Sequence, residues 1–201
     1  PSGKMKSREG TVVDADDLME EMITTAKEIS LEKGKGEDSA EADELYRMIG
    51  MAALKYFILK VDPKKKMLFN PQESIDINGH TGPFIQYTHA RIKSLLRRAG
   101  DWKLEVRSWK LEILPKEKEL LKLIHQFPAV LKEAGEGYSP ALLANYIYDL
   151  VKEYNQCYHD FPVLKEEDEE KKNFRLQLTA LTGNVIADSL RLLGIQAPEK
   201  M

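Results

Sequence analysis

The sequence has 201 residues, of which 42% are hydrophobic, and its 30 basic and 33 acidic side chains give a net charge of −3 at pH 7. This length and hydrophobic content allow a sizeable core, which excludes disorder of the whole chain and fits one large domain or two small ones. The nearly balanced charge argues against a general nucleic-acid binder, so any contact with RNA must be local.

Composition also limits the chemistry that is expected. The single cysteine, Cys157, excludes an internal disulfide and a multi-cysteine metal site, and it fits a reducing compartment. The four histidines show no ligand spacing, so no metal is predicted. Because there is no secretory signal and no apolar run close to about 18 residues, we expect a soluble, cytoplasmic chain that does not enter a membrane.

The first ten residues form a basic segment between glycines and contain Lys4, Met5, Lys6, Ser7 and Arg8. Cations and backbone amides on such a loop can follow the charge that develops in phosphoryl or adenylyl transfer. A solvated basic terminus is the simpler interpretation of this segment taken alone. Because the chain starts without a methionine and on a flexible basic loop, we interpret it as a fragment of a longer protein.

Two helices are predicted in the first 60 residues. One begins near Asp14 and ends at Gly34, and the second spans residues 40–59. Between residues 61 and 78, short apolar runs are interrupted by Pro71, which predicts extended structure or a small pair of strands.

The segment from Gly79 to Ile92 combines the start of a helix with two different faces. Thr81 is the predicted N-cap, and the helix is expected to run to about Ala99. Apolar residues recur at three- and four-residue steps on one face, together with His89. We expect His89 to be a buried core histidine rather than a base or a metal ligand.

The other face of this helix carries Tyr87, Arg91 and Arg98. An aromatic plane and two guanidinium groups at helical spacing suit unpaired bases and phosphates of RNA. The alternative is an ordinary surface stripe, in which the tyrosine packs on a neighbour and the arginines pair with glutamates. The pattern itself leaves both interpretations open.

Further helices are predicted towards the C-terminus. One begins at Pro115, a second short one at Pro128 and a third at Pro140, while residues 165–172 are expected to be a solvated charge run. The last helix ends at Gly194. Helices with this patterning and short connections predict an all-α bundle.

An aromatic face marks the helix that begins at Pro140. Tyr154 and Tyr158 lie on this face, one helical turn apart. Aromatic residues at helical spacing usually pack in a core, whereas contact with RNA bases is the alternative.

Two motifs resemble the C-terminal part of class I arginyl-tRNA synthetases. The family pattern Gly-x-Thr-Gly-Pro-Tyr-x-Gln-Tyr-Ala-His-Ala-Arg is matched by residues 79–91, with Phe84 and Thr88 as departures. The last ten residues, 192–201, are similar to the family ending Leu-Leu-Gly-x-x-x-Pro-Glu-Arg-Met. The two matches stand in the family's order and span most of the chain.

The first loop is similar to the Lys-Met-Ser-Lys-Ser ATP loop of the same family, although Lys6 takes the usual serine position and Ser7 that of the second lysine. The resemblance therefore implies a degenerate ATP loop at Lys4, Met5, Lys6 and Ser7 as the catalytic remnant. The family's His-Ile-Gly-His motif and nucleotide-binding sheet are not found in this sequence.

The resemblance implies a function and a division of the chain. The parent enzyme would be an arginine-tRNA ligase that joins arginine to tRNA(Arg) through an arginyl-adenylate, using ATP and magnesium. Residues 1–79 would be the tail of its catalytic domain, and residues 80–201 a helical anticodon-binding domain of the DALR type. The fragment alone would be inactive and would need no cofactor. The missing N-terminal catalytic domain would be its partner within a chain that is usually monomeric.

The family's anticodon-binding positions correspond here to Tyr87, Tyr158 and the terminal Met201, and we add Arg91 and Arg98 from the basic stripe. The alternative function is a stand-alone helical module that binds a protein through an exposed helix groove.

Overall fold

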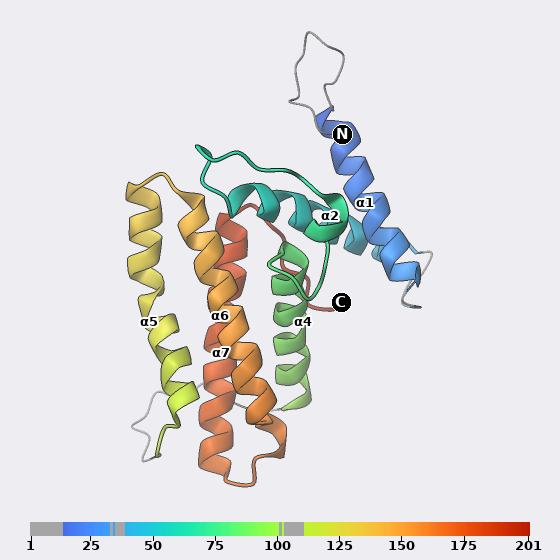
Figure 1. Cartoon of the computed structure of the whole chain (residues 1–201). Helices are drawn as coiled ribbons and strands as arrows, with labels where there is room; N and C mark the ends of the chain where they lie inside the picture. The colour runs from blue at the N-terminus through green and yellow to red at the C-terminus, as the bar shows by residue number, and fades with distance from the viewer. Residues whose placement is uncertain (1–13, 33, 35–38, 101, 103–110) are drawn as a thin grey trace.

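The computed structural model describes residues 14–32, 34, 39–100, 102 and 111–201, and all of its regular structure there is helical (Figure 1). The elements are α1 (Ala15–Glu32), α2 (Ala40–Leu59), α3 (Pro71–Ser74), α4 (Gly82–Arg98), α5 (Pro115–Glu136), α6 (Pro140–Asp160), the 3₁₀ helix η1 (Val163–Lys165) and α7 (Glu169–Leu192). The predicted all-α class is confirmed. The ATP-loop remnant predicted at Lys4 to Ser7 lies outside the described residues.

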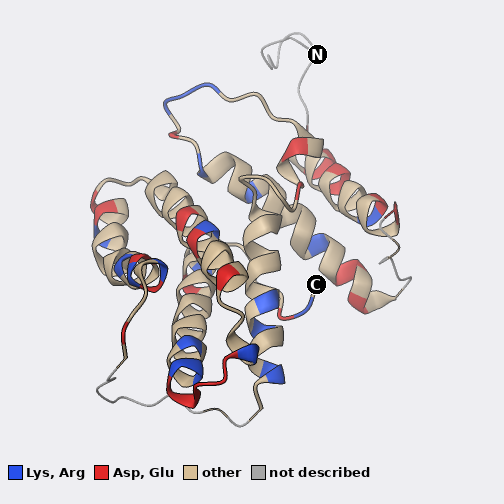
Figure 2. Cartoon of the chain, turned by 60° about the horizontal axis from the view of Figure 1, so that its bottom comes forward, with Lys and Arg blue, Asp and Glu red and all other residues tan. Residues whose placement is uncertain are grey.

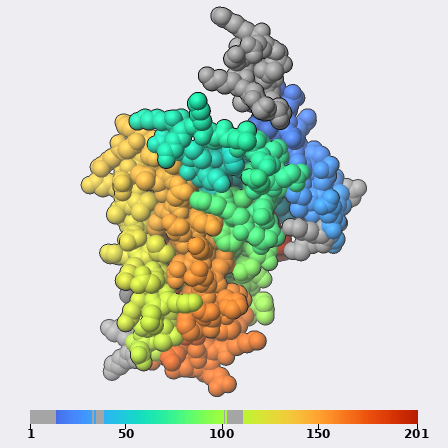
Figure 3. All heavy atoms as spheres, in the orientation of Figure 1, coloured from blue at the N-terminus to red at the C-terminus, as the bar shows by residue number. Residues whose placement is uncertain are grey.

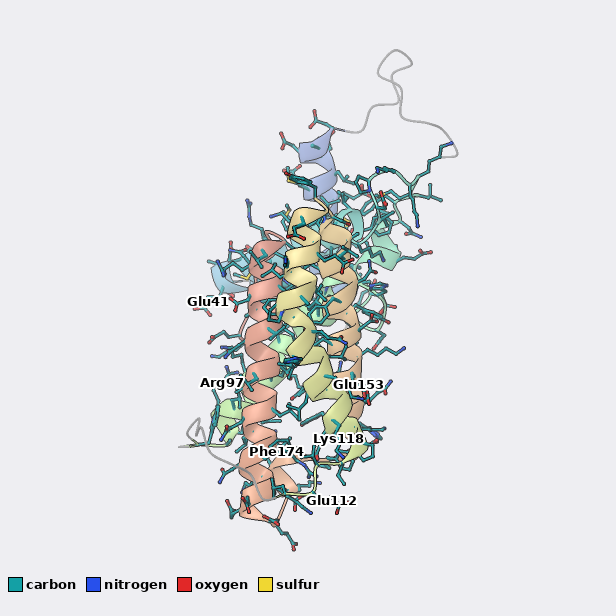
Figure 4. All side chains as sticks on the ribbon, turned by 90° about the vertical axis from the view of Figure 1, so that its left-hand side faces the viewer. Glu41, Arg97, Glu112, Lys118, Glu153 and Phe174 are labelled. Carbon is teal, nitrogen blue, oxygen red and sulfur yellow. The ribbon has the colours of Figure 1, made fainter. Side chains whose placement is uncertain are left out.

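Helices α4, α5, α6 and α7 run alongside one another as a bundle, and α2 crosses one end of it (Figure 1). Helix α1 packs on the outer side of α2 and protrudes beside the bundle, whereas α5 and α6 cover much of the face seen in Figure 3. Figure 4 shows Glu112 and Phe174 at the same end of the molecule, where α5 and α7 begin.

Two hydrophobic clusters meet along α2. Its Tyr46 and Ile49 pack with α1, whereas Ala52 and Tyr56 belong to the bundle core. Helix α4 approaches α2 so closely that a Cβ on Gly82 would overlap the backbone carbonyl of Ala52. Glycine at the start of α4 therefore permits the contact that holds this helix in place.

Between residues 61 and 78 the sequence predicted extended structure or a small pair of strands. The strand pair is wrong, because the segment holds irregular chain and the one-turn helix α3 but no strand. The Oδ1 atom of Asn70 caps α3 by accepting hydrogen bonds from the backbone N–H groups of Gln72 and Glu73. Pro71 then occupies the first helical turn, where its missing N–H is harmless. The Asn-Pro pair was the overlooked start signal.

Two further predictions need correction. Helix α5 continues through Pro128 instead of restarting there. Side chains on both sides of the proline pack on α6, where the Phe127 and Tyr146 rings stack and the Tyr146 hydroxyl donates to the Leu123 carbonyl. This packing offsets the lost backbone hydrogen bond. The charge run at 165–172 is only partly a solvated loop, because Asp168 caps α7 and Glu166 binds an arginine of that helix.

Candidate nucleic-acid interface

Helix α4 has the two faces that the sequence predicted. The Thr81 side chain caps it by accepting a hydrogen bond of 3.2 Å from the backbone N–H of Phe84. Its apolar face is buried and includes Ile85, Ile92 and His89, so the prediction of a core histidine is confirmed. The stripe of Tyr87, Arg91 and Arg98 lies on the other side of the helix and is partly or fully exposed.

Arg91 lies between two aromatic rings from different helices. Its guanidinium carbon is 4.8 Å from the ring centre of Tyr87 on α4 and 6.0 Å from that of Tyr158 on α6. A neutral amide orients it, because Arg91 Nη1 donates to Asn155 Oδ1 at 3.1 Å. The Asn155 Nδ2 atom in turn donates to Thr88 Oγ1 at 3.0 Å. The guanidinium plane is thus held in place while its charge keeps no carboxylate partner among the described residues.

The five side chains predicted to bind RNA line one hollow of about 330 Å³. They are Tyr87, Arg91, Arg98, Tyr158 and Met201, and Arg97 and Lys200 complete the basic part of its lining. We call this hollow the α4–α6 groove. Three segments separated by more than 40 residues thus converge on one site because α7 returns the end of the chain to α4.

The charge around the groove is uneven. Figure 2 shows Lys and Arg gathered on the last turns of α4 beside the C-terminus, whereas acidic residues mark the start of α1. Arg97 donates two hydrogen bonds to the Glu199 carbonyl, at 3.2 and 3.3 Å, so its cation is tied to the wall of the groove. A local positive surface on a chain of net charge −3 is what the composition requires of an RNA site.

Two tyrosines of α6 differ in role. Tyr154 is only 2% exposed, and burial raises the pKa of its phenol well above the ordinary value, which confirms the expectation that it packs in the core. Tyr158 is half-buried, with its ring 6.2 Å from the Tyr154 ring and nearly parallel to it. The buried tyrosine therefore orients the one that lines the groove.

A second aromatic cluster fixes the start of α4. The Tyr56 hydroxyl donates to the Ala144 carbonyl at 2.6 Å and lies 2.9 Å from His80 Nε2. The His80 ring stacks on Tyr148 at 3.8 Å, and burial lowers its pKa below the ordinary value. His80 joins α2, α4 and α6 through these contacts, a role that no pattern in the sequence indicated.

The described ranges were also searched for metal sites and for membrane-spanning helices. They contain no group of three or more His, Cys, Asp or Glu side chains arranged to hold a metal ion. Likewise, no helix of the described chain is long and apolar enough to span a membrane.

The fold and the groove match a known class of protein. The family of the DALR anticodon binding domain matches residues 85–201, and the chain belongs to this family. The chain is also 57% identical over its whole length to proteins named arginine–tRNA ligase from Parabacteroides distasonis and Bacteroides fragilis. It spans 34% of the length of each, and it corresponds to their C-terminal third.

Solved structures give the same assignment. The arginyl-tRNA synthetase of Thermus thermophilus superposes with a TM-score of 0.86 at 34% identity, over 96% of this chain and 33% of that one. The arginyl-tRNA synthetase of Plasmodium falciparum superposes with a TM-score of 0.80 at 25% identity, over 94% of this chain and 34% of that one. The resemblance that the two sequence motifs indicated is thus confirmed.

Proposed function

We propose that the α4–α6 groove binds the anticodon loop of tRNA(Arg). The observation that carries the proposal is the Arg91 guanidinium held between the rings of Tyr87 and Tyr158, in a hollow that Met201 lines. Unpaired bases of RNA loops stack on aromatic rings and on guanidinium planes, so this arrangement offers several stacking surfaces at once. Exposed Arg98 at the same hollow is available to a phosphate.

The neutral partner of Arg91 supports RNA over an internal ion pair. Among the described residues its hydrogen-bond partner is the Asn155 amide, which orients the guanidinium without neutralising it. A phosphate or a base edge can therefore gain the full charge-assisted interaction.

The proposal extends to the longer protein of which this chain would be the C-terminal third. That protein would be an arginine-tRNA ligase, using ATP and magnesium to form an arginyl-adenylate in the cytoplasm, and it would act as a monomer. Residues 1–79 would be the tail of its catalytic domain, with a degenerate ATP loop at Lys4 to Ser7, and residues 80–201 its anticodon-binding domain. Without the N-terminal catalytic domain, the chain would bind tRNA and form no adenylate.

Titration of the purified chain with tRNA(Arg) at several salt concentrations tests the binding. We expect salt-dependent binding that Tyr87→Ala weakens about 10-fold, since stacking on one base contributes on the order of 1–3 kcal/mol. Tyr138→Ala is the matched control: Tyr138 is 90% exposed, on the turn before α6, at the opposite end of that helix from Tyr158. Absence of binding at low salt, or an equal loss in both variants, would contradict the proposal.

A further inference from the structure

The last eight residues, 194–201, run back along α4 without regular secondary structure after the single turn that ends α7. We call them the C-terminal segment. Exposed Arg97 and partly buried Lys93 of α4 hold its outer part, because Arg97 binds the Glu199 carbonyl and Lys93 Nζ lies 3.5 Å from Glu199 Oε1. Such exposed contacts are screened by salt and contribute little by themselves.

Gln86 holds the inner part of the C-terminal segment from a fully buried position. Its Nε2 atom donates to the Gln196 carbonyl at 2.8 Å and to the Met48 carbonyl at 3.2 Å. One buried amide group therefore links α2, α4 and the segment. A buried amide is costly unless it is hydrogen-bonded, and these two contacts satisfy the NH2 group of Gln86, whereas its Oε1 atom is buried without a partner in the described part of the chain.

His89, one helical turn further along α4, makes a second buried link. The side chain is 2% exposed, and Nδ1 lies 2.9 Å from the Pro198 carbonyl. A carbonyl only accepts, so the hydrogen of the neutral imidazole is on Nδ1. Burial lowers the pKa of His89, against the effect of its bond to Pro198, which favours this neutral form. Its Nε2 atom is buried without a partner in the described part of the chain, so the bond to the Pro198 carbonyl is the hydrogen bond that the imidazole makes there.

We propose that Gln86 and His89 are positioning residues: they hold the C-terminal segment on α4 and so place Lys200 and Met201 as one wall of the α4–α6 groove. Neither side chain lines that groove, whereas Lys200 and Met201 do. The backbone carbonyls of an irregular segment need partners, and α4 supplies them at positions 86, 89 and 97. The effect on RNA rests on the proposed function of the groove, whereas the effect on the segment does not.

The test replaces the His89 donor in two ways. His89→Leu removes the donor at similar volume, whereas His89→Asn keeps an N–H donor near the position of Nδ1. Hydrogen–deuterium exchange of the backbone amides of residues 195–197, 199 and 200, measured without RNA, is expected to be at least about 10-fold faster in His89→Leu and close to that of the parent chain in His89→Asn. Gln86→Met removes the second donor and gives an independent measurement if His89→Leu does not fold.

Binding of tRNA(Arg) gives the second readout. We expect His89→Leu to weaken it about 10-fold and His89→Asn to restore most of the loss. In a chain that ends at Gly194, His89→Leu should cause no further loss, because both changes act through the same segment. Unchanged exchange in both His89→Leu and Gln86→Met overturns the proposal, and so does unchanged binding in a variant whose segment exchanges faster.

The two readouts separate this proposal from the proposed function. If the parent chain does not bind tRNA(Arg), the proposed function of the groove fails. Hydrogen–deuterium exchange then tests by itself whether Gln86 and His89 hold the C-terminal segment. An unchanged exchange rate in both variants would show that they do not.

Discussion

Two regions of the bundle place an arginine on an aromatic ring and use it differently. In the α4–α6 groove, the Arg91 guanidinium carbon lies 4.8 Å from the Tyr87 ring centre. Where α5 and α7 begin, the Arg175 guanidinium carbon lies 4.9 Å from the Phe161 ring centre. We call this second region the α5–α7 clasp, and it consists of Glu117, Phe161, Glu166 and Arg175.

The clasp neutralises its arginine and the groove does not. Arg175 is 8% exposed and donates to Glu117 Oε1 at 2.7 Å and to Glu166 Oε2 at 2.6 Å. The other oxygen of Glu117 accepts the backbone N–H of Leu114 at the start of α5. A buried cation with two carboxylates links the helices that carry them, whereas a partly exposed cation oriented by an amide stays available to a ligand.

The largest expected effect is that of Glu117→Ala on stability. The change leaves Arg175 buried with one carboxylate and frees the Leu114 N–H, so the free energy of unfolding should fall by about 3 kcal/mol. Urea denaturation followed by circular dichroism measures it. Glu119→Ala is the control on the same helix, since its pair with Lys122 is exposed and is expected to contribute less than about 1 kcal/mol. Equal losses in the two variants would remove the distinction between clasp and surface.

Cys157 tests whether the clasp side of α6 is closed. Burial raises the pKa of its thiol to about 11, and the nearby Glu117 carboxylate acts in the same direction. The thiolate is the reactive form, so alkylation by iodoacetamide at pH 8 should be about 100-fold slower than in the denatured chain. The rate should also keep rising with pH beyond 9. A plateau near pH 9 would show that water reaches this side of the helix.

Arg91→Ala should weaken binding of tRNA(Arg) about 10-fold and lower the salt dependence by about one ion, if the guanidinium meets a phosphate. Arg91→Lys keeps the charge but loses the plane between the rings, so it should recover only part of the loss. Arg191→Ala is the control, because Arg191 is exposed and pairs with Asp188 on α7. Titrations at two salt concentrations measure both the affinity and its salt dependence. Equal binding by Arg91→Ala and the parent chain would contradict a contact between Arg91 and tRNA(Arg).

The smallest effect is expected at an ordinary surface ion pair. Lys132 Nζ lies 3.8 Å from Glu136 Oε1 on α5, and both side chains are largely exposed. Lys132→Ala should change the free energy of unfolding by less than about 0.5 kcal/mol. If Lys132→Ala lowered the free energy of unfolding as much as Glu117→Ala, an ion pair would stabilise this protein equally whether it is buried or exposed, and burial would not explain the stability of the clasp.

Much of the fold followed from local signals. Thr81 and Gly82 mark the start of α4, and α2 begins and ends where the apolar periodicity predicted. The errors arose where local rules met packing: Pro128 reads as a helix start, yet the contacts of Phe127 with α6 keep α5 continuous. The acidic run before α7 was predicted to be a solvated loop. Its partner, Arg175, lies further along α7, and the contact forms only when that helix packs against α5.

The residues that line the α4–α6 groove were predictable, but the contacts that hold them in place were not. Helical spacing put Tyr87, Arg91 and Arg98 on one face, and the resemblance to a family added Tyr158 and Met201. Asn155 could not be found this way, because an isolated asparagine on a helix carries no signal of the arginine it orients. The bonds of Gln86 and His89 to the Gln196 and Pro198 carbonyls were also not apparent, since these partners lie more than 100 residues away.

The sequence by itself determined most of the long helices, the Thr81 cap and the family, because these depend on spacing and on residue types within a few turns. Only the tertiary structure decided which arginine is neutralised and which is open. It also decided that the end of the chain completes the groove. Those outcomes depend on contacts of α7 with α5 and on contacts between α4, α6 and the C-terminal segment, which exist only once α7 has packed and brought distant residues together.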